Sequence, residues 1–222
     1  MYSSNSNNPA RDYLKPPYDS ISNILPTSLG RLHIRGPVSP EQLEKYSLSE
    51  GLCCFRPSSR QHQSLLNLSR EDDGMIFTAT LANIIISYAA FQKPDYPWWQ
   101  ERCFPELIEL GSIETDPVWR KMGISKSLME NLFDTDGFTF FEDFIVIAVQ
   151  FIQSWDLKNT GMSPWAYRDF MLNFFKKFGF VTWETVDPEV REHPCNILVA
   201  RAGKNICTSN IKLFSNCCLG TN

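Results

Sequence analysis

Hydrophobic and polar positions divide the chain into short strands and amphipathic helices. Residues 30–37 alternate between apolar and polar side chains and end at a Gly-Pro pair, which predicts a short edge strand. Two β-rich runs at 74–81 and 83–91 have almost no connection between them, as in a hairpin. A continuous apolar run at 144–151 predicts a fully buried strand. The pattern therefore indicates a sheet.

Helical patterns lie between these strands. Ser39 is a natural N-cap and is followed by a proline at the first helical position, which predicts a helix there. Residues 60–70 and 162–178 predict two more helices, the latter ending at Gly179. Another helix is indicated by apolar residues four positions apart, Ile124, Leu128 and Leu132. With the other strand candidates, the expected order is β-α-α-β-β-β-α-β-α-β-β, an α/β domain.

Size and charge narrow the picture further. The 222 residues, 43% of them hydrophobic, suit one globular domain, although the length also allows two small ones. A formal net charge of −4 gives no general attraction to nucleic acid or to an anionic membrane. The longest apolar stretches fall far short of the roughly 20 residues that a membrane span needs. We therefore expect no nucleic-acid or membrane partner.

The two ends of the chain differ from its middle. Residues 1–29 are rich in Ser, Asn and Pro and lack the apolar run of a signal peptide, so we expect a mobile tail, a domain from 30 to 205, and an extension at 206–222. Seven cysteines, an odd number without a C-x-x-C spacing, indicate reduced thiols and a cytoplasmic protein. Adjacent cysteines are not the usual spacing of zinc ligands, and no metal site is expected.

One strand-turn-helix segment carries chemistry. A strand candidate at 106–115 leads through the turn 120–126 into a helix, whose first N–H groups and dipole favour an anion such as a pyrophosphate. Gly123 sits where a side chain would block close approach of the backbone. A glycine turn alone indicates little, because many helices begin near a glycine.

The longer pattern is more specific. Residues 109–125 read E-L-x-x-I-x-T-x-P-x-W-R-x-x-G-x-S, which resembles the acetyl-CoA-binding core of the GNAT acetyltransferase superfamily, E-[LI]-x-x-[LI]-x-V-x-P-x-[YF]-[QR]-x-x-G-x-[GA]. The segments 36–46, 55–65 and 106–123 resemble its acetoin-utilisation branch more closely. The resemblance covers about residues 30–205. It implies a GNAT fold, with a mixed central sheet of about six to seven strands flanked by helices and splayed at the acetyl-CoA site.

The resemblance also implies roles for individual residues. Backbone groups of three strand residues would line the pantetheine arm of acetyl-CoA: Ile113, Glu114 and Thr115. The turn and the start of the helix would surround the pyrophosphate: Arg120, Lys121, Met122, Gly123, Ile124, Ser125 and Lys126. For the cations, a solvated helix start is the alternative interpretation.

Catalysis requires a base, because a lysine ammonium with a pKa near 10.4 is mostly protonated at neutral pH. Glu109 occupies the position where the family commonly carries this base; the alternative is an ordinary surface or ion-paired carboxylate. Phe175 stands where many GNAT enzymes have a tyrosine that protonates the departing thiolate. Tyr167 is a candidate substitute acid, or else a packed residue.

The resemblance implies an N-acetyltransferase that uses acetyl-CoA as co-substrate and needs no metal. The acetoin-utilisation branch implies a protein lysine as acceptor, with acetyl-CoA synthetase as the target protein. Two alternatives stay open at this stage: an acetyltransferase for a small amine, and a non-catalytic acyl-CoA-binding module.

Overall fold

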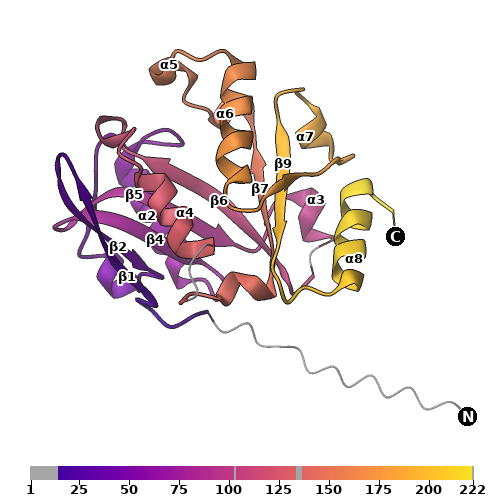
Figure 1. Cartoon of the computed structure of the whole chain (residues 1–222), viewed down its shortest axis with the longest axis horizontal. Helices are drawn as coiled ribbons and strands as arrows, with labels where there is room; N and C mark the ends of the chain where they lie inside the picture. Colours follow the sequence, from indigo (N-terminus) through magenta and orange to yellow (C-terminus); the bar gives the residue numbers. More distant parts are fainter. Residues whose placement is uncertain (1–14, 103, 134–136, 222) are drawn as a thin grey trace, which may run out of the picture.

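A computed structural model describes residues 15–102, 104–133 and 137–221 of the chain. Its centre is a mixed sheet with helices on both faces (Figure 1). The strands are β1 (Ile21–Thr27), β2 (Gly30–Gly36), β3 (Ser47–Leu48), β4 (Met75–Leu81), β5 (Ile84–Gln92), β6 (Leu107–Thr115), β7 (Ile145–Gln150), β8 (Val181–Thr182) and β9 (Ile197–Ala202). The α-helices are α1 (Pro40–Leu43), α2 (Ser58–Arg70), α3 (Pro97–Gln100), α4 (Ile124–Phe133), α5 (Leu157–Thr160), α6 (Pro164–Lys176), α7 (Pro188–Arg191) and α8 (Thr208–Leu219). Short 3-10 helices lie at Pro117–Trp119, Phe140–Asp143 and Ile152–Ser154.

The strand order is β1-β2-β4-β5-β6-β7-β9-β8, with β3 paired to β5. Neighbours run antiparallel, apart from the parallel pairs β6–β7 and β3–β5. The expected α/β fold with a mixed sheet is therefore confirmed. The sheet has more than the expected six to seven strands, because β1 and the two-residue strand β3 add to it.

The expectation of a mobile tail up to residue 29 is wrong for β1. All seven residues of β1 pair with β2 in a hairpin, and Ile21 is buried. Pro26 is tolerated because β1 is an edge strand, where a missing N–H breaks no ladder. Residues 1–14 lie outside the described residues.

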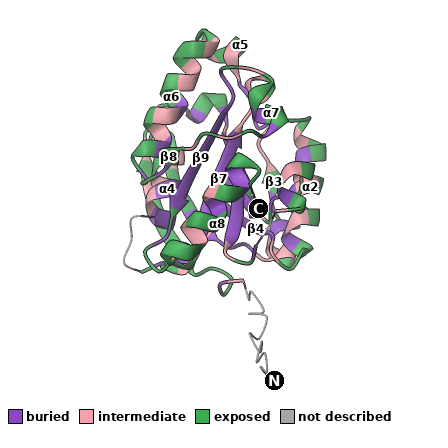
Figure 2. Cartoon of the chain, turned by 90° about the vertical axis from the view of Figure 1, so that its right-hand side faces the viewer, coloured by how far each residue is buried: buried purple, intermediate pink, exposed green. Residues whose placement is uncertain are grey.

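Three apolar clusters fill the space between sheet and helices. On one face, α4 and α6 bury residues such as Leu128 and Phe175 against the strands. On the other, α1 and α2 cover β4 and β5, while α3, α7 and α8 cover β7 and β9. Figure 2 shows the buried strands β7 and β9 between helices of the two layers. The sheet is thus covered on both faces, as its apolar strands require.

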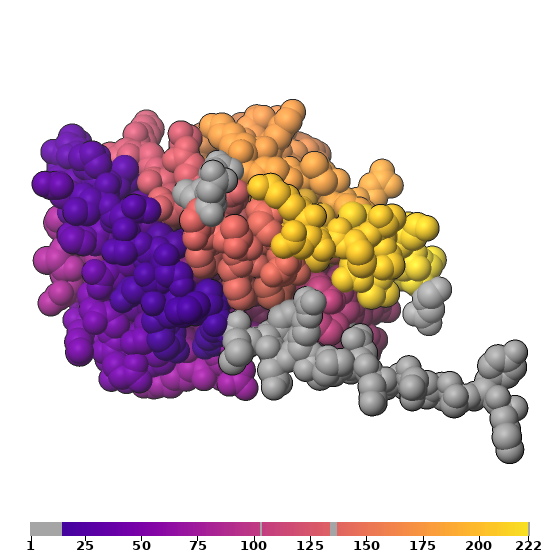
Figure 3. Space-filling view, turned by 60° about the horizontal axis from the view of Figure 1, so that its bottom comes forward, coloured from indigo at the N-terminus to yellow at the C-terminus, as the bar shows by residue number. Residues whose placement is uncertain are grey.

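The C-terminal segment, expected as an extension, packs on the domain. Helix α8 places Phe214 against the indole ring of Trp99 in a stacked arrangement, with ring centroids 5.7 Å apart. Cys217 and Cys218 are buried on the same helix. Figure 3 shows α8 (yellow) and the N-terminal strands (indigo) toward opposite ends of the molecule. No helix among the described residues is long and apolar enough to cross a membrane.

Candidate active site

The two central strands diverge at Glu109. β6 pairs with β7 only from Leu107 to Glu109, and no described strand pairs with the rest of that edge of β6. On its other edge β6 pairs with β5, where Ala90 faces Ser112 and Phe91 faces Leu110. Gly111 is therefore the extra residue of a bulge. The free edge of β6 can pair with an extended ligand.

The turn before α4 is shaped for an anion. Lys121 and Gly123 have positive φ angles of 65° and 76°, which turn successive backbone N–H groups out of the strand path. The first helical bond runs from Ser127 N–H to the Gly123 carbonyl at 2.8 Å. N–H groups within the first turn lack intrahelical acceptors and face outward. A Cβ added at Gly123 would meet no atom within 4 Å, so the space in front of the turn is open.

A chain of hydroxyl groups ties the turn to the sheet. Ser87 Oγ donates to the Glu114 carbonyl at 2.7 Å, and Ser87 Oγ and Thr115 Oγ1 are also 2.7 Å apart. Thr115 Oγ1 lies 2.6 Å from Ser125 Oγ. Since Ser87 has one proton and donates it to the carbonyl, Thr115 donates to Ser87 and Ser125 donates to Thr115. Thr115 and Ser125, two of the three departures from the family pattern, are therefore hydrogen-bonded to each other.

This direction of donation leaves the Ser125 hydroxyl without a proton for a phosphate. We therefore expect Ser125→Ala to change acetyl-CoA affinity by less than about threefold, because only the backbone N–H of residue 125 faces the ligand. The same change should lower the free energy of unfolding by about 1 kcal/mol, the usual net value of a lost hydrogen bond. Isothermal titration with acetyl-CoA and urea unfolding measure the two effects. A large loss of affinity with unchanged stability would contradict this assignment.

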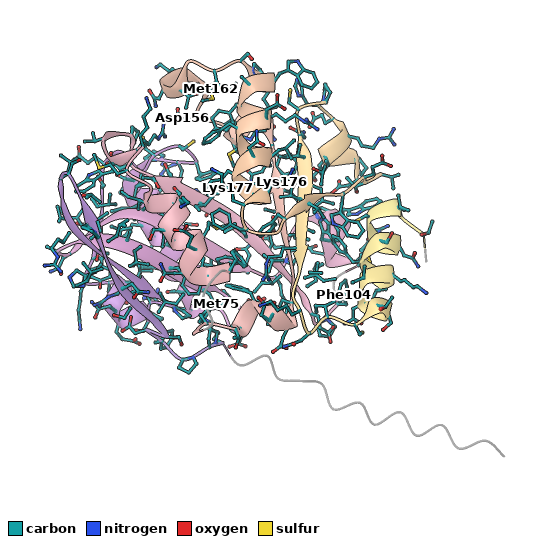
Figure 4. The ribbon with its side chains drawn as sticks, viewed as in Figure 1. Met75, Phe104, Asp156, Met162, Lys176 and Lys177 are labelled. Carbon is teal, nitrogen blue, oxygen red and sulfur yellow. The ribbon has the colours of Figure 1, made fainter. Side chains whose placement is uncertain are left out.

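Arg120 and Lys126, two of the cations of the turn, have different surroundings. Arg120 Nη2 pairs with Asp156 Oδ2 at 2.5 Å, and its Nε donates to the Thr115 carbonyl at 3.4 Å. Burial would raise the pKa of Asp156, but hydrogen bonds from Arg120 and Asn159 hold it below its usual value. Asp156 lies beside α5 at the upper edge of the molecule (Figure 4). Arg120 thus links the turn to the segment after β7.

Lys126 forms an ion pair with Glu130 at 2.8 Å on the exposed side of α4, as a solvated helix start would. Met122 contacts the β1–β2 hairpin through the Ser28 hydroxyl, 3.9 Å from its sulfur. The N-terminal hairpin therefore borders the turn.

Glu109 is a buried carboxyl group. It is only 7% exposed, and no described residue forms a hydrogen bond or ion pair with it. Burial, with a smaller contribution from Asp95, raises its pKa to about 8. A base with a pKa near neutral combines a useful ionised fraction with a strong affinity for a proton. The alternative of an exposed or ion-paired carboxylate does not hold for this residue.

Glu114 has a different role from its two neighbours on β6. Its carboxylate accepts hydrogen bonds from the Cys54 N–H at 2.8 Å and from the Tyr88 hydroxyl at 2.9 Å. Burial nevertheless raises its pKa. The side chain of Glu114 therefore holds the β3–α2 loop on the sheet. The side chains of Ile113 and Thr115 are half-buried on the other face, toward α4.

Tyr167 does not share the surroundings of Glu109. Its ring stacks on Trp155, with centroids 5.0 Å apart and an interplanar angle of 23°. Burial raises the pKa of Tyr167, with smaller electrostatic contributions from Cys54 and Asp156. Tyr167 therefore stays protonated at neutral pH, and it lies near the turn before α4 rather than near Glu109.

Phe175 is fully buried among the rings of Phe174 and Phe180. We expect Phe175→Tyr to give no gain in rate and to cost about 1–3 kcal/mol of stability, because the added hydroxyl would be buried without a designed partner. Thermal unfolding and a steady-state assay test this. A faster variant of unchanged stability would show that the position reaches the reacting atoms.

Several residues of the site escaped prediction from sequence. Asp116 accepts hydrogen bonds from the Ser49 hydroxyl and, at 2.8 Å, from the Val118 N–H. A Cβ on Gly51 would come within 2.4 Å of the Asp116 carboxylate, so only glycine fits there. Burial raises the pKa of Tyr96, and the nearby carboxylate of Glu109 raises it further. These pairs are far apart or irregularly spaced in sequence, and no local pattern marks them.

The described residues contain no group of three or more His, Cys, Asp or Glu placed to hold a metal ion. Cys53, Cys54, Cys195, Cys207, Cys217 and Cys218 are free thiols, and Cys103 lies outside the described residues.

The mixed sheet, the strands that diverge at Glu109 and the turn before α4 match the arrangement that the sequence motif implies for the GNAT fold. No family model matches the chain. It is 35% identical over 192 residues to the acetoin utilization protein AcuA of Bacillus licheniformis. The aligned residues cover 86% of this chain and 90% of that protein. AcuA of Bacillus subtilis is 35% identical over 190 residues, covering 85% and 89%.

A crystal structure of an acetoin utilization protein from Exiguobacterium sibiricum matches with a TM-score of 0.84 at 35% identity, over 90% of this chain and 94% of that one. The chain belongs to the family of the acetoin utilization protein AcuA. The resemblance to the acetoin-utilisation branch is thereby confirmed.

Proposed function

We propose that the protein transfers an acetyl group from acetyl-CoA to the side-chain amine of a protein lysine. The observation that carries this proposal is Glu109, a buried carboxyl group with a pKa of about 8 at the point where β6 and β7 diverge. Burying a carboxyl group without a partner costs free energy, and such groups are concentrated at functional sites. A module that only binds acyl-CoA has no need of this base.

The turn before α4 supports acetyl-CoA as co-substrate. In this proposal the outward N–H groups of Lys121–Lys126 bind the pyrophosphate, and Gly123 leaves room for it. The pantetheine arm pairs with the free edge of β6 along Ile113, Glu114 and Thr115. This path leads from the turn to the level of Glu109. Arg120 and Lys121 add positive charge nearby, with Arg120 held by Asp156.

The proposed reaction begins when Glu109 removes a proton from the lysine ammonium. The free amine attacks the thioester carbonyl, so that a C–N bond forms and the C–S bond breaks. The second nitrogen proton passes to the departing thiolate. A thiol has a pKa near 8.5, so its thiolate departs near neutral pH without a strong acid. Tyr167 is the proposed relay for this proton: its hydroxyl, which burial keeps protonated, gives its proton to the thiolate and regains one from the nitrogen.

The finer identity of the acceptor rests on family membership. We propose acetyl-CoA synthetase as the protein that carries the lysine, in acetoin or acetate metabolism and in the cytoplasm. A small amine as acceptor is the alternative. Glu109 lies on the face of the sheet that also carries Leu107 and Trp99, opposite to α4, so acceptor and pyrophosphate would approach from different faces.

The proposal is tested by incubating the protein with acetyl-CoA and purified acetyl-CoA synthetase, and by measuring free CoA and acetyl-lysine by mass spectrometry. Equal amounts of CoA and acetyl-lysine are expected. A parallel reaction with small amines, such as spermidine, tests the alternative. Binding of acetyl-CoA without release of CoA to any acceptor would refute the catalytic function.

A further inference from the structure

A cavity lies outside the candidate active site. It has a volume of about 310 Å³ and is bordered by α6, α7, β8 and the start of β9. In Figure 1, α6 and α7 stand on either side of β9 near the top of the molecule. A volume of this size holds a small organic molecule or a few side chains, and is much larger than one water needs.

The charged lining of this cavity is entirely basic. Arg168 comes from α6 and Arg191 from α7, while no Asp or Glu lines the cavity. The contrast with the net charge of −4 for the whole chain makes this local charge notable. The Nε of Arg168 is buried and has no hydrogen-bond partner among the described residues. The carboxylate of Asp169 is 3.9 Å from Arg168 Nη1 and 70% exposed, so it neutralises Arg168 weakly.

The other polar groups of the lining are largely fixed in their hydrogen bonding. His193 Nδ1 accepts the Cys195 N–H at 3.0 Å, which places the ring proton of the neutral imidazole on Nε2, as a donor. Asn196 uses its oxygen for the Ile152 N–H and its nitrogen for the Glu189 carbonyl. The cavity therefore offers two guanidinium groups and an imidazole N–H, and its amide is already satisfied.

We propose that this cavity binds the carboxylate groups of an acidic ligand. Guanidinium forks match carboxylates in geometry and charge, and the lining places two of them, from Arg168 and Arg191, around one cavity. The volume exceeds what one small anion fills, so the ligand carries more than one carboxylate. Two sources share this chemistry: a free polycarboxylate, and neighbouring acidic side chains of a partner protein.

The site is separate from the acetyl-CoA site of the proposed function. The turn before α4 and the lining of this cavity have no residue in common. Asn196 connects the cavity to the segment that follows β7, because it binds Ile152 N–H at 2.9 Å. An occupant would therefore lie next to the segment that follows β7. Its binding does not depend on catalysis and can be measured without an acceptor.

The test uses the full chain and two probes, citrate as a polycarboxylate and hexaglutamate as an acidic peptide. Trp183 lines the cavity, so its fluorescence reports binding, with calorimetry as the second measurement. We expect at least one probe to bind, and Arg168→Gln to weaken that binding about tenfold or more, since a charged hydrogen bond contributes roughly 1.5–3 kcal/mol. The matched control is Lys176→Gln, which removes an exposed charge from the same helix outside the cavity (Figure 4).

Each outcome decides between the sources or against the site. Citrate binding supports a small ligand, and binding of hexaglutamate alone supports acidic side chains of a partner. Equal losses in Arg168→Gln and Lys176→Gln would overturn the proposal, because the attraction would then be diffuse. Binding of neither probe, equally tight binding of inorganic phosphate, or displacement of citrate by CoA would also overturn it. Circular dichroism confirms that both variants are folded.

Discussion

Gly123→Val is expected to weaken acetyl-CoA binding on the order of 100-fold, equivalent to about 2.7 kcal/mol. The reason is space: no protein atom lies within 4 Å of a Cβ at this position, so a valine side chain would occupy the volume in front of the turn where the pyrophosphate approaches. A φ of 76° also strains valine, and we expect stability to fall by about 1–2 kcal/mol. Calorimetric titration with acetyl-CoA measures the loss of affinity.

Gly179→Val is the matched control for this experiment. Gly179 has a φ of 81°, and its Cβ would meet only the Arg201 side chain at an ordinary 3.7 Å. It follows α6 and lies near Phe180, which packs on the C-terminal end of α4, away from the turn. The control should therefore lose similar stability but keep its affinity for acetyl-CoA. Wild-type affinity in Gly123→Val would rule out the turn as the pyrophosphate site.

Glu109→Gln is expected to lower kcat on the order of 100-fold or more while leaving the affinity for acetyl-CoA unchanged. The amide cannot accept the ammonium proton but keeps nearly the same shape. In the wild type the rate should rise with pH through about 8, where Glu109 ionises, and this limb should be absent from the variant. A pH profile of kcat/KM for both proteins tests this. An unchanged rate would remove Glu109 as the base.

Although Glu109→Gln should lower the rate, it should raise the stability of the protein at high pH. The pKa of Glu109 is raised from 4.5 to about 8, so between these values the folded protein holds a proton that the unfolded chain releases. The free energy of unfolding therefore falls as pH rises through this window, by about 5 kcal/mol at most. Glu109→Gln removes that dependence and should be the more stable protein at pH 9. Urea unfolding at pH 6 and 9 distinguishes this result from simple structural damage, which would lower stability at both pH values.

Local patterns predicted most of the elements near the site. The hairpin expected at 74–81 and 83–91 is β4 and β5, and the buried strand expected at 144–151 is β7. The helix expected at 162–178 is α6. These patterns reflect which side chains leave water, and such information is contained in a few consecutive residues. β1 escaped prediction because its burial depends on pairing with β2, and its own composition resembles a tail.

In the candidate site too, local sequence predicted some features, while contacts between distant segments decided others. The motif from Glu109 to Ser125 was enough to predict the turn, because strand, turn and helix are contiguous, and its resemblance to the GNAT core implied the divergence near it. The spacing did not show that Arg120 is paired to Asp156, 36 residues away, or that the Glu114 side chain is occupied by Cys54 and Tyr88. Those pairings arise where separate segments meet.

The sequence by itself determined the order of most elements between β2 and β9, the family, and the identity of the residues in the turn. Only the tertiary structure decided which of them are free for chemistry. Glu109 has a high pKa because it is buried where β6 and β7 diverge, and no stretch of neighbouring residues specifies such burial. Phe175 is a core residue for the same reason. Periodicity depends on neighbours in the chain, whereas desolvation depends on every element that packs around a group.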